Sequence, residues 1–194
     1  MDSKFPGHIT PTVKNWIVEK RKLIFSALVF DYYKQTTKHP EQNKRGDFDV
    51  LECHDWVNIL AFDEDEKLLM VEQYRIGIGL RTLETPGGVI HDNEDPLMSA
   101  QRELREECGY LASTWKKLGA IAPNPAFMNN YCHYFLATGL TYDGPLELDP
   151  LEDIVVHSIP WNEVLKMNLK GEINHSLILA GFSLYQTHKE LKGG

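Results

Sequence analysis

Three glutamates and two arginines fall within six consecutive residues, and their charges are dense enough to take part in chemistry. Residues 102–107 read Arg-Glu-Leu-Arg-Glu-Glu. If this stretch is helical, Glu103 and Glu107 are i,i+4 neighbours with Glu106 beside them, and each pair of like charges costs roughly a few tenths of a kcal/mol. A divalent cation would remove that repulsion, because Mg2+ and Mn2+ prefer hard oxygen ligands. The alternative interpretation is a solvated acidic helix face.

The surrounding residues predict one helix from Pro96 to Cys108. Its apolar residues recur at helical spacing and form a single stripe. The members of the stripe are Leu97, Ala100, Leu104 and Cys108. Asp95 is a suitable N-cap before a proline at the first helical position, and Gly109 is a suitable terminator. We therefore expect a loop–helix–loop unit whose apolar stripe is buried and whose acidic face is turned to solvent.

Fixed residues at defined spacing extend on both sides of this helix. They run Gly88, five residues, Glu94, seven residues, Arg102-Glu103-Leu104, one residue, Glu106-Glu107, one residue and Gly109. This pattern resembles the Nudix box of the Nudix hydrolase superfamily. Tyr110 stands where that family usually has an aliphatic residue, which affects local packing more than chemistry. The resemblance covers about Val57 to Trp161 and is weak at both ends of the chain.

The resemblance implies a metal-dependent hydrolase that splits the pyrophosphate bond of a nucleoside diphosphate derivative. The metal ligands that it implies are Glu103, Glu106, Glu107 and the Gly87 carbonyl. Mg2+ is the expected ion, with Mn2+ as the alternative. The catalytic residues that it implies are Glu152, which completes the metal cluster or serves as general base, Glu106 as a supporting acid, and Arg102 with Glu94 as an orienting ion pair. Glu147 and Asp149 remain rivals of Glu152 for the role of base.

Segments outside the box look like those of the ADP-ribose pyrophosphatase and nucleoside diphosphate sugar hydrolase group. A Gln-Tyr-Arg segment ends at Arg75, and Pro125 lies 16 residues beyond Gly109, as in that group. The expected substrate-binding residues are Arg75, Glu84, Arg81 and Phe127. The leading hypothesis is hydrolysis of ADP-ribose to AMP and ribose 5-phosphate. The alternatives are another nucleoside diphosphate sugar such as GDP-mannose, a dinucleotide, a non-catalytic module that senses ADP-ribose, and pyrophosphohydrolysis at RNA 5′ ends.

The resemblance also implies an α+β fold, an α/β/α sandwich, for the elements that position these residues. We expect a Nudix fold with a mixed central sheet in residues 54–194, and a small antiparallel β-subdomain with an N-terminal arm in residues 1–53. The arm is Met1 to Lys14, two strands lie within Trp16 to Tyr33, Lys34 to Gly46 is a polar loop, and Asp47 to His54 is a returning strand. These early strands have little core of their own, so they either pack on the main domain or pair with another copy of the chain. We favour a homodimer interface, and the resemblance also implies that this region holds the substrate's base.

The catalytic domain is expected to contain further strands and two C-terminal helices. The strands are 55–61, 68–74, 115–122, 131–140 and 154–159, and the helices are 161–169 and 173–191.

Charge, hydrophobicity and cysteine content indicate which binding partners and which cellular compartment to expect. The net charge of −8 opposes a sequence-independent hold on nucleic-acid phosphates. No run of about 18 apolar residues occurs, so no membrane-spanning helix is expected. Cys53, Cys108 and Cys132 lack metal-ligand spacing and cannot all pair, which is typical of a reducing compartment, and we expect a cytoplasmic protein.

Overall fold

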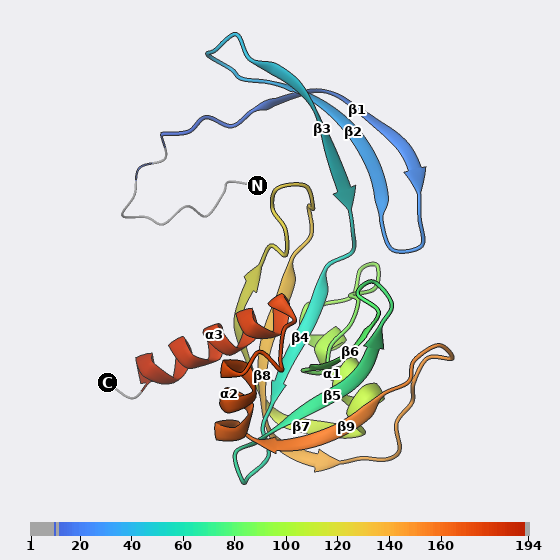
Figure 1. Cartoon of the computed structure of the whole chain (residues 1–194), viewed down its shortest axis with the longest axis vertical. Helices are drawn as coiled ribbons and strands as arrows, with labels where there is room; N and C mark the ends of the chain where they lie inside the picture. The colour runs from blue at the N-terminus through green and yellow to red at the C-terminus, as the bar shows by residue number, and fades with distance from the viewer. Residues whose placement is uncertain (1–9, 11, 193–194) are drawn as a thin grey trace. The chain divides into compact units, whose positions relative to one another are not determined.

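A computed structural model describes residue 10 and residues 12–192 of the chain. These residues form two compact units (Figure 1). The first unit comprises the chain up to Cys53 together with residues 124–129, and the second comprises residues 54–123 and the chain from Asn130 onward. Most of the expected N-terminal arm, Met1 to Lys14, lies outside the described residues.

The first unit is a three-stranded antiparallel sheet in the order β1-β2-β3. The strands are β1 (Ile17–Ser26), β2 (Asp31–Lys38) and β3 (Arg45–Glu52). The polar loop predicted from Lys34 is shorter than expected and covers only residues 39–44. The prediction was wrong for 34–38 because β2 is the central strand, and its polar side chains are paired across the sheet: Lys34 with Asp49 at 2.7 Å and Thr36 with Asp47 at 2.6 Å.

The second unit contains two three-stranded sheets. In the first, with order β4-β8-β7, strand β4 (Trp56–Ala61) is parallel to β8 (Cys132–Tyr142), and β8 is antiparallel to β7 (Tyr110–Ile121). In the second, with order β6-β5-β9, β5 (Lys67–Arg75) is antiparallel to both β6 (Leu80–Glu84) and β9 (Val155–Pro160). The expectation of mixed strand directions is confirmed.

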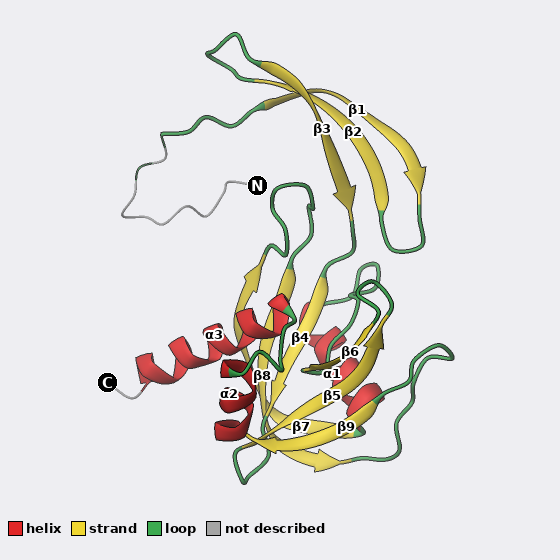
Figure 2. Ribbon diagram, in the orientation of Figure 1, coloured by secondary structure: helices red, strands yellow, loops and turns green. Residues whose placement is uncertain are grey.

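Side-chain alternation along these strands produces two separate hydrophobic cores. Val57 and Ile59 of β4 enter one core, whereas Leu60 enters the other, because successive side chains of a strand point to opposite faces. The first core contains Leu104 of helix α1 (Pro96–Cys108), and the second contains residues of α2 (Trp161–Leu169) and α3 (Ser176–Lys192). Figure 2 shows these helices flanking the strands, which confirms the α/β/α sandwich.

Two element boundaries in this unit differ from expectation. Strand β7 begins at Tyr110, five residues before the predicted start, because it pairs with β8 along its whole length from the Tyr110–Tyr142 pair onward. Helix α3 begins at Ser176 rather than Ile173, since the His175 ring accepts a hydrogen bond from the Leu177 N–H at 3.2 Å. Within residues 10 and 12–192, no helix has both the length and the apolar character needed to span a bilayer.

Candidate active site

Helix α1 has the predicted ends. The Asp95 carboxylate accepts a hydrogen bond from the Leu97 N–H at 2.8 Å, which caps the first turn. Gly109 ends the helix in a left-handed conformation with φ of 74°. A Cβ at Gly109 would also lie 2.2 Å from the Gly144 carbonyl oxygen, so glycine is required by both conformation and space. The ends of α1 therefore fix where its glutamates stand.

The acidic face of α1 is not turned to solvent as a whole, and this expectation was wrong for Glu103 and Glu107. Their exposed fractions are 8% and 3%. The glycine segment, Gly87 and Gly88, covers them: the Gly87 N–H donates to Glu107 Oε2 at 2.9 Å. A Cβ at Gly88 would lie 2.3 Å from Glu103 Oε1. The glycines thus let the backbone approach the carboxylates closely, and this approach removes them from water.

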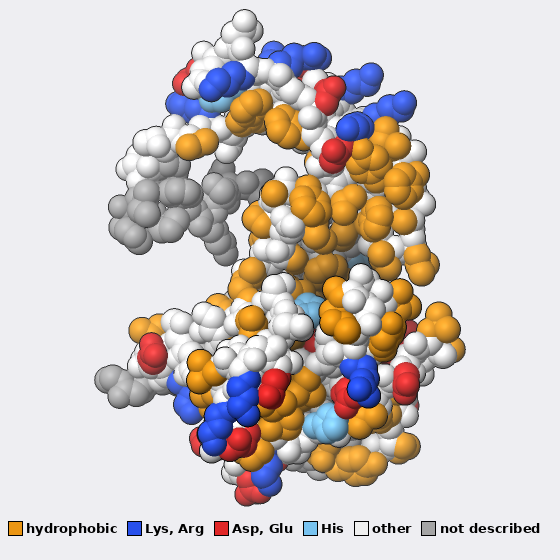
Figure 3. Space-filling view, viewed as in Figure 1, with side chains coloured by type: hydrophobic (Ala, Val, Ile, Leu, Met, Phe, Trp, Pro, Cys, Tyr) orange, Lys and Arg blue, Asp and Glu red, His pale blue; other side chains and the backbone are white. Residues whose placement is uncertain are grey.

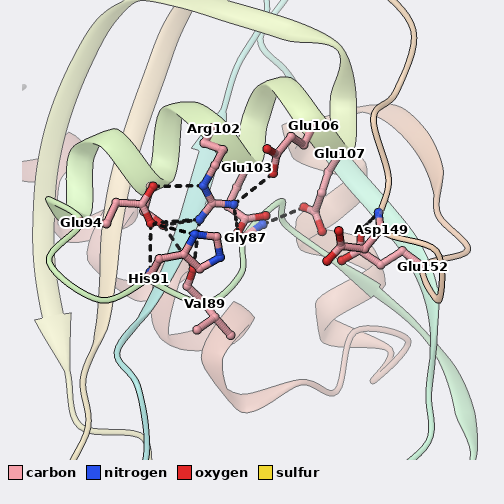
Figure 4. Close-up of polar contacts among 11 residues, drawn as sticks. Gly87, Val89, His91, Glu94, Arg102, Glu103, Glu106, Glu107, Asp149 and Glu152 are labelled. Atoms are coloured by element: carbon pink, nitrogen blue, oxygen red, sulfur yellow. Dashed lines mark hydrogen bonds and ion pairs between the residues drawn. The ribbon is translucent and has the colours of Figure 1, made fainter. Parts of the chain in front are cut away.

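Arg102 holds the opposite side of this carboxylate group (Figure 4). Its Nε and Nη2 donate to the two oxygens of Glu94 at 3.0 and 3.1 Å, as expected for an orienting pair. Its Nη1 donates to Glu103 Oε1 at 2.8 Å and to Glu106 Oε2 at 3.0 Å. The Val89 carbonyl accepts from Nη2 at 3.1 Å, so the same guanidinium ties the loop to the helix.

These groups line a cavity of about 290 Å³ in the second unit. Its walls come from the end of β5, the glycine segment, α1 and the segment between β8 and β9. The residues lining it are Gln73, Arg75, Gly87, Gly88, Val89, His91, Arg102, Glu103, Glu106, Glu107, Glu147, Asp149 and Glu152. The structure therefore brings together the four expected metal ligands, Arg102, Arg75, Glu152 and both rivals of Glu152.

Burial controls the electrostatics of the two covered glutamates. Desolvation raises the pKa of Glu107 to about 8, against the hydrogen bond from Gly87 that favours the charged form. Desolvation likewise raises the pKa of Glu103 to about 7, although Arg102 opposes the shift. The negative charge of Glu152 raises both pKa values further. The pKa of Glu94 falls to about 2, mainly because Arg102 donates to it.

This donor set fits a divalent cation. Buried carboxylates that repel one another are stabilised by a nearby positive charge, and carboxylate oxygens are the ligands that Mg2+ and Mn2+ prefer. Among the described residues, no three His, Cys, Asp or Glu side chains already surround a common point at which a metal would be held. Arg102 Nη1, which bridges Glu103 and Glu106, supplies the nearest positive charge. A cation held by these glutamates would take over that neutralisation.

Arg75 reaches the cavity from the end of β5, and Glu84 holds it there. Arg75 Nε and Nη2 donate to the two Glu84 oxygens at 2.8 and 2.7 Å. Glu84 is 3% exposed and also accepts from Thr82 Oγ1 at 2.6 Å. Burial alone would raise the pKa of Glu84, but the bonds from Arg75 and Thr82 outweigh it and the pKa is lowered. Glu84 does not line the cavity, so it contacts Arg75 from behind.

The three acidic candidates of the segment 143–152 differ in their partners. Glu147 Oε1 accepts from Arg105 Nη2 at 2.9 Å, so one of its oxygens is occupied by an ion pair. Glu152 Oε2 accepts from the Asp149 N–H at 3.0 Å within a turn. Glu152 faces the cavity beside Glu107 in Figure 4, in agreement with its effect on the Glu107 pKa. These contacts favour Glu152 over Glu147 as the base.

Three of the four expected substrate-binding residues do not line this cavity: Glu84, which contacts Arg75 from behind, Arg81 and Phe127. Arg81 lines a different cavity of about 390 Å³ together with Glu72 and His157. Phe127 belongs to the first unit, where the Leu51 N–H donates to its carbonyl, and its side chain is 42% exposed. Their roles in substrate binding stay predictions.

Two residues at the site were missed by sequence reasoning. The His91 N–H donates to Glu94 Oε2 at 3.0 Å, and the His91 side chain lines the cavity. Arg105 contacts the segment that carries Glu152. The charge of Arg105 was visible inside the acidic cluster, but its partners lie 38 to 42 positions further along the chain, a separation that helical spacing does not reveal.

Comparison with known proteins agrees with this geometry. The family model described as "NUDIX domain" matches residues 52–180. An "ADP-ribose pyrophosphatase" of Mycobacterium tuberculosis is 38% identical over 135 residues, which is 69% of this chain, and the chain spans 65% of that relative's length. An "ADP-ribose pyrophosphatase" of Bacillus subtilis is 31% identical over 154 residues, or 79% of this chain and 83% of the relative.

A solved structure supports the fold. The chain in "Crystal structure of ADP compounds hydrolase" superimposes with a TM-score of 0.79 at 17% identity, over 95% of this chain and 98% of that chain. The family match covers more than half of the residues and includes the glycine segment, α1 and the segment that carries Glu152. The chain belongs to the NUDIX domain family.

Proposed function

We propose that this chain hydrolyses the pyrophosphate bond of nucleoside diphosphate derivatives, with ADP-ribose as the main substrate and AMP and ribose 5-phosphate as products. The observation that carries the proposal is the cavity in which two buried glutamates of α1 face Glu152, with Arg75 on the wall. The names of the two bacterial relatives support ADP-ribose as the substrate.

The proposed metal ligands are Glu103, Glu106, Glu107 and the Gly87 carbonyl. The Gly87 N–H faces Glu107, and in an extended segment the N–H and C=O of one residue point to the same side, which supports the carbonyl as a ligand. When bound there, Mg2+, or Mn2+ as the alternative, supplies neutralisation of the diphosphate charge and a lower pKa for the attacking water. Arg102 and Glu94 keep the loop and the helix in register around this site.

The remaining chemistry falls to two side chains that face the cavity. Glu152 accepts a proton from the attacking water, and the oxygen of that water forms a bond to one phosphorus. The bond from that phosphorus to the bridging oxygen breaks, and the bridging oxygen leaves with the other phosphate. Arg75 donates N–H groups to phosphate oxygens, because Glu84 occupies only its Nε and part of Nη2.

The test uses the purified full-length chain with Mg2+ and a substrate panel. The panel contains ADP-ribose, GDP-mannose, a dinucleotide, a nucleoside triphosphate and an RNA with a 5′ triphosphate, and products are separated by chromatography. We expect AMP and ribose 5-phosphate from ADP-ribose, at a higher kcat/KM than for the other compounds, and loss of turnover in excess chelator. Metal-dependent binding of ADP-ribose without products would refute hydrolysis and favour a sensor.

We also propose that the first unit mediates a homodimer. Apolar side chains on β1 and β3 that are between 44% and 52% exposed support it: Ile17, Val18, Leu23, Ile24, Phe25 and Phe48. Figure 3 shows hydrophobic side chains gathered over this sheet. A three-stranded sheet with apolar faces needs a covering layer for stability, and a second copy of the chain provides one.

We further propose a cytoplasmic location. All three cysteines of the sequence are free thiols, which is typical of proteins kept in a reducing compartment. Cell fractionation tests this location, and recovery of the protein outside the cytoplasm would refute it.

A further inference from the structure

Arg105 lies on α1 between Glu103 and Glu106 but does not line the cavity. Its guanidinium donates to three acceptors in one short segment. Nε donates to the Asp143 carboxylate, Nη1 to the Pro145 carbonyl at 3.0 Å, and Nη2 to Glu147 Oε1 at 2.9 Å. The Arg105 side chain is 20% exposed, whereas its partners Asp143 and Glu147 are 42% and 65% exposed, so this fork lies at the surface of the protein. A single planar group therefore fixes three points of the segment 143–147.

Backbone hydrogen bonds set the same segment in register with the last turn of α1. The Glu147 N–H donates to the Glu106 carbonyl at 2.9 Å, and the Asp143 N–H donates to the Gly109 carbonyl at 2.8 Å. The last carbonyls of a helix have no partner within the helix, so the segment satisfies one of them. A Cβ at Gly144 would lie 3.1 Å from Arg105 Nη2, which shows how closely the segment approaches the side chain.

Electrostatics alone would drive this segment away from the helix. It brings acidic side chains, including Asp143 and Glu147, to a helix C-terminus that carries partial negative charge and three further glutamates. Arg105 places a positive charge at this C-terminal turn. Without that charge, only backbone hydrogen bonds, such as those of Asp143 and Glu147, would oppose the repulsion between the segment and the helix C-terminus.

The segment continues directly into the turn that carries the proposed base. The Glu152 N–H donates to the Asp149 carbonyl at 2.9 Å, and Glu152 Oε2 accepts from the Asp149 N–H at 3.0 Å. The turn holds Glu152 against Asp149, and Asp149 stands two residues after Glu147. The position of Glu152 in the cavity therefore depends on where Glu147 is held.

We propose that Arg105 is a positioning residue, which locks the segment 143–152 onto the last turn of α1 and thereby sets the distance from Glu152 to the water that it deprotonates. This inference rests on the proposed function, because it assumes that Glu152 is the base. Arg105 does not touch the substrate, so its effect falls on kcat rather than on KM.

A double-mutant cycle tests the inference. Arg105→Ala, Glu152→Gln and the double variant are compared with the full-length chain, with ADP-ribose and Mg2+. A displacement of about 1 Å costs up to about 100-fold in rate, so we expect Arg105→Ala to lower kcat by about 10- to 100-fold with KM changed by less than about threefold. In the Glu152→Gln background the same change should cost less than about threefold, because the group that Arg105 positions is already disabled.

Two further variants separate positioning from a general loss of charge or of folding. Lys166→Ala removes a comparable surface cation that is paired with Glu163 on α2, and it should leave kcat unchanged. Asp143→Ala removes one of the three contacts of Arg105 at a residue that does not line the cavity, and it should lower kcat by a smaller factor than Arg105→Ala. Because Asp143→Ala keeps the other two contacts, it decides the question if Arg105→Ala does not fold.

The outcomes are distinct. A kcat for Arg105→Ala within threefold of the parent, or an equal loss in both backgrounds, would overturn the inference. Hydrogen exchange at the Glu147 and Asp143 amides adds a readout without turnover: faster exchange in Arg105→Ala supports the lock, and unchanged exchange overturns it. If the parent chain hydrolyses no compound of the panel, the proposed function fails, and the exchange data still decide whether Arg105 holds the segment.

Discussion

Replacing Glu107 by glutamine should stabilise the metal-free protein while it abolishes turnover. The pKa of Glu107 rises from 4.5 to about 8 on folding, mainly through burial. The pKa is higher in the folded state than in the unfolded state, so the contribution of Glu107 to the free energy of unfolding is largest below pH 4.5. That contribution is lost as the pH rises from 4.5 to about 8. At about pH 7.5 the shift spans about three pKa units, which corresponds to about 4 kcal/mol.

Glutamine carries no charge and recovers part of this energy. Its carbonyl still accepts the Gly87 N–H, but its own amide hydrogens are buried without a designed partner, at a cost of about 1–3 kcal/mol. The net effect at about pH 7.5 is a stabilisation of about 1–3 kcal/mol, or about 2–10 °C in Tm for a chain of this size. At about pH 5 the carboxyl is already protonated, so the variant should be less stable than the parent.

The assay is thermal unfolding in chelator, followed by tryptophan fluorescence. Three of the four tryptophans, Trp56, Trp115 and Trp161, belong to the second unit, so the signal reports on the unit that contains Glu107. Glu163→Gln, at an exposed position of α2, is the matched control and should change Tm by less than about 1 °C. Adding Mg2+ should raise the Tm of the parent but not of Glu107→Gln, because a ligand that binds only the folded state stabilises it. A variant that is less stable than the parent at both pH values would refute the reasoning.

Three further predictions concern the glycine segment, Arg75 and the first unit. Gly88→Ala should weaken Mn2+ binding and lower kcat by about 100-fold or more, because the new Cβ would lie 2.3 Å from Glu103 Oε1; Mn2+ titration by electron paramagnetic resonance checks this, and parent-like affinity would contradict it. Arg75→Ala should lower the stability at neutral pH by about 1–3 kcal/mol, since it leaves Glu84 buried without its cation. Because the pKa of Glu84 is lowered in the folded state, this loss should shrink as the pH falls below 4.5. Thermal melts of Arg75→Ala and the parent at about pH 7 and about pH 3.5 measure the change, and an equal loss at both would contradict it. Deleting Met1 to Asp47 should convert the homodimer to a monomer, as should Phe25→Asp, because both remove apolar surface of β1; light scattering after size-exclusion chromatography decides this, and a stable truncated dimer would rule out this interface.

The parts of the fold that could be predicted are those with a local signal. Helix α1 has both predicted ends because Asp95, Pro96 and Gly109 act within one turn of the positions that they define. Strand β2 was placed less well, because residues 34–38 are polar and their strand state depends on partners in β3 that local propensity does not include. The start of β7 at Tyr110 was missed for the same reason, since pairing with β8 determines it.

In the candidate site, too, local features could be predicted and tertiary contacts could not. Spacing on one helix was enough to place Glu103, Glu106 and Glu107 together, because i,i+3 and i,i+4 positions share a face. It was not enough to predict their burial, since the glycine segment that covers them acts through a tertiary contact. An acidic face is most often solvated, and only the approach of Gly87 and Gly88 reverses that expectation.

Burial of the acidic face explains why one helix carries both the glutamates and the two arginines. Desolvation disfavours the charged forms of Glu103 and Glu107, and this raises the pKa values of both side chains in the metal-free protein. Arg102 lies towards Glu94 and Val89 and limits the repulsion on the loop side, while Arg105 does so on the side of segment 143–152. The cavity is lined by Glu103, Glu107 and Glu152, and burial resists a negative charge on the first two. A divalent cation held there would favour the charged carboxylates and would also attract a diphosphate, so the binding of the metal and of the substrate should be mutually reinforcing.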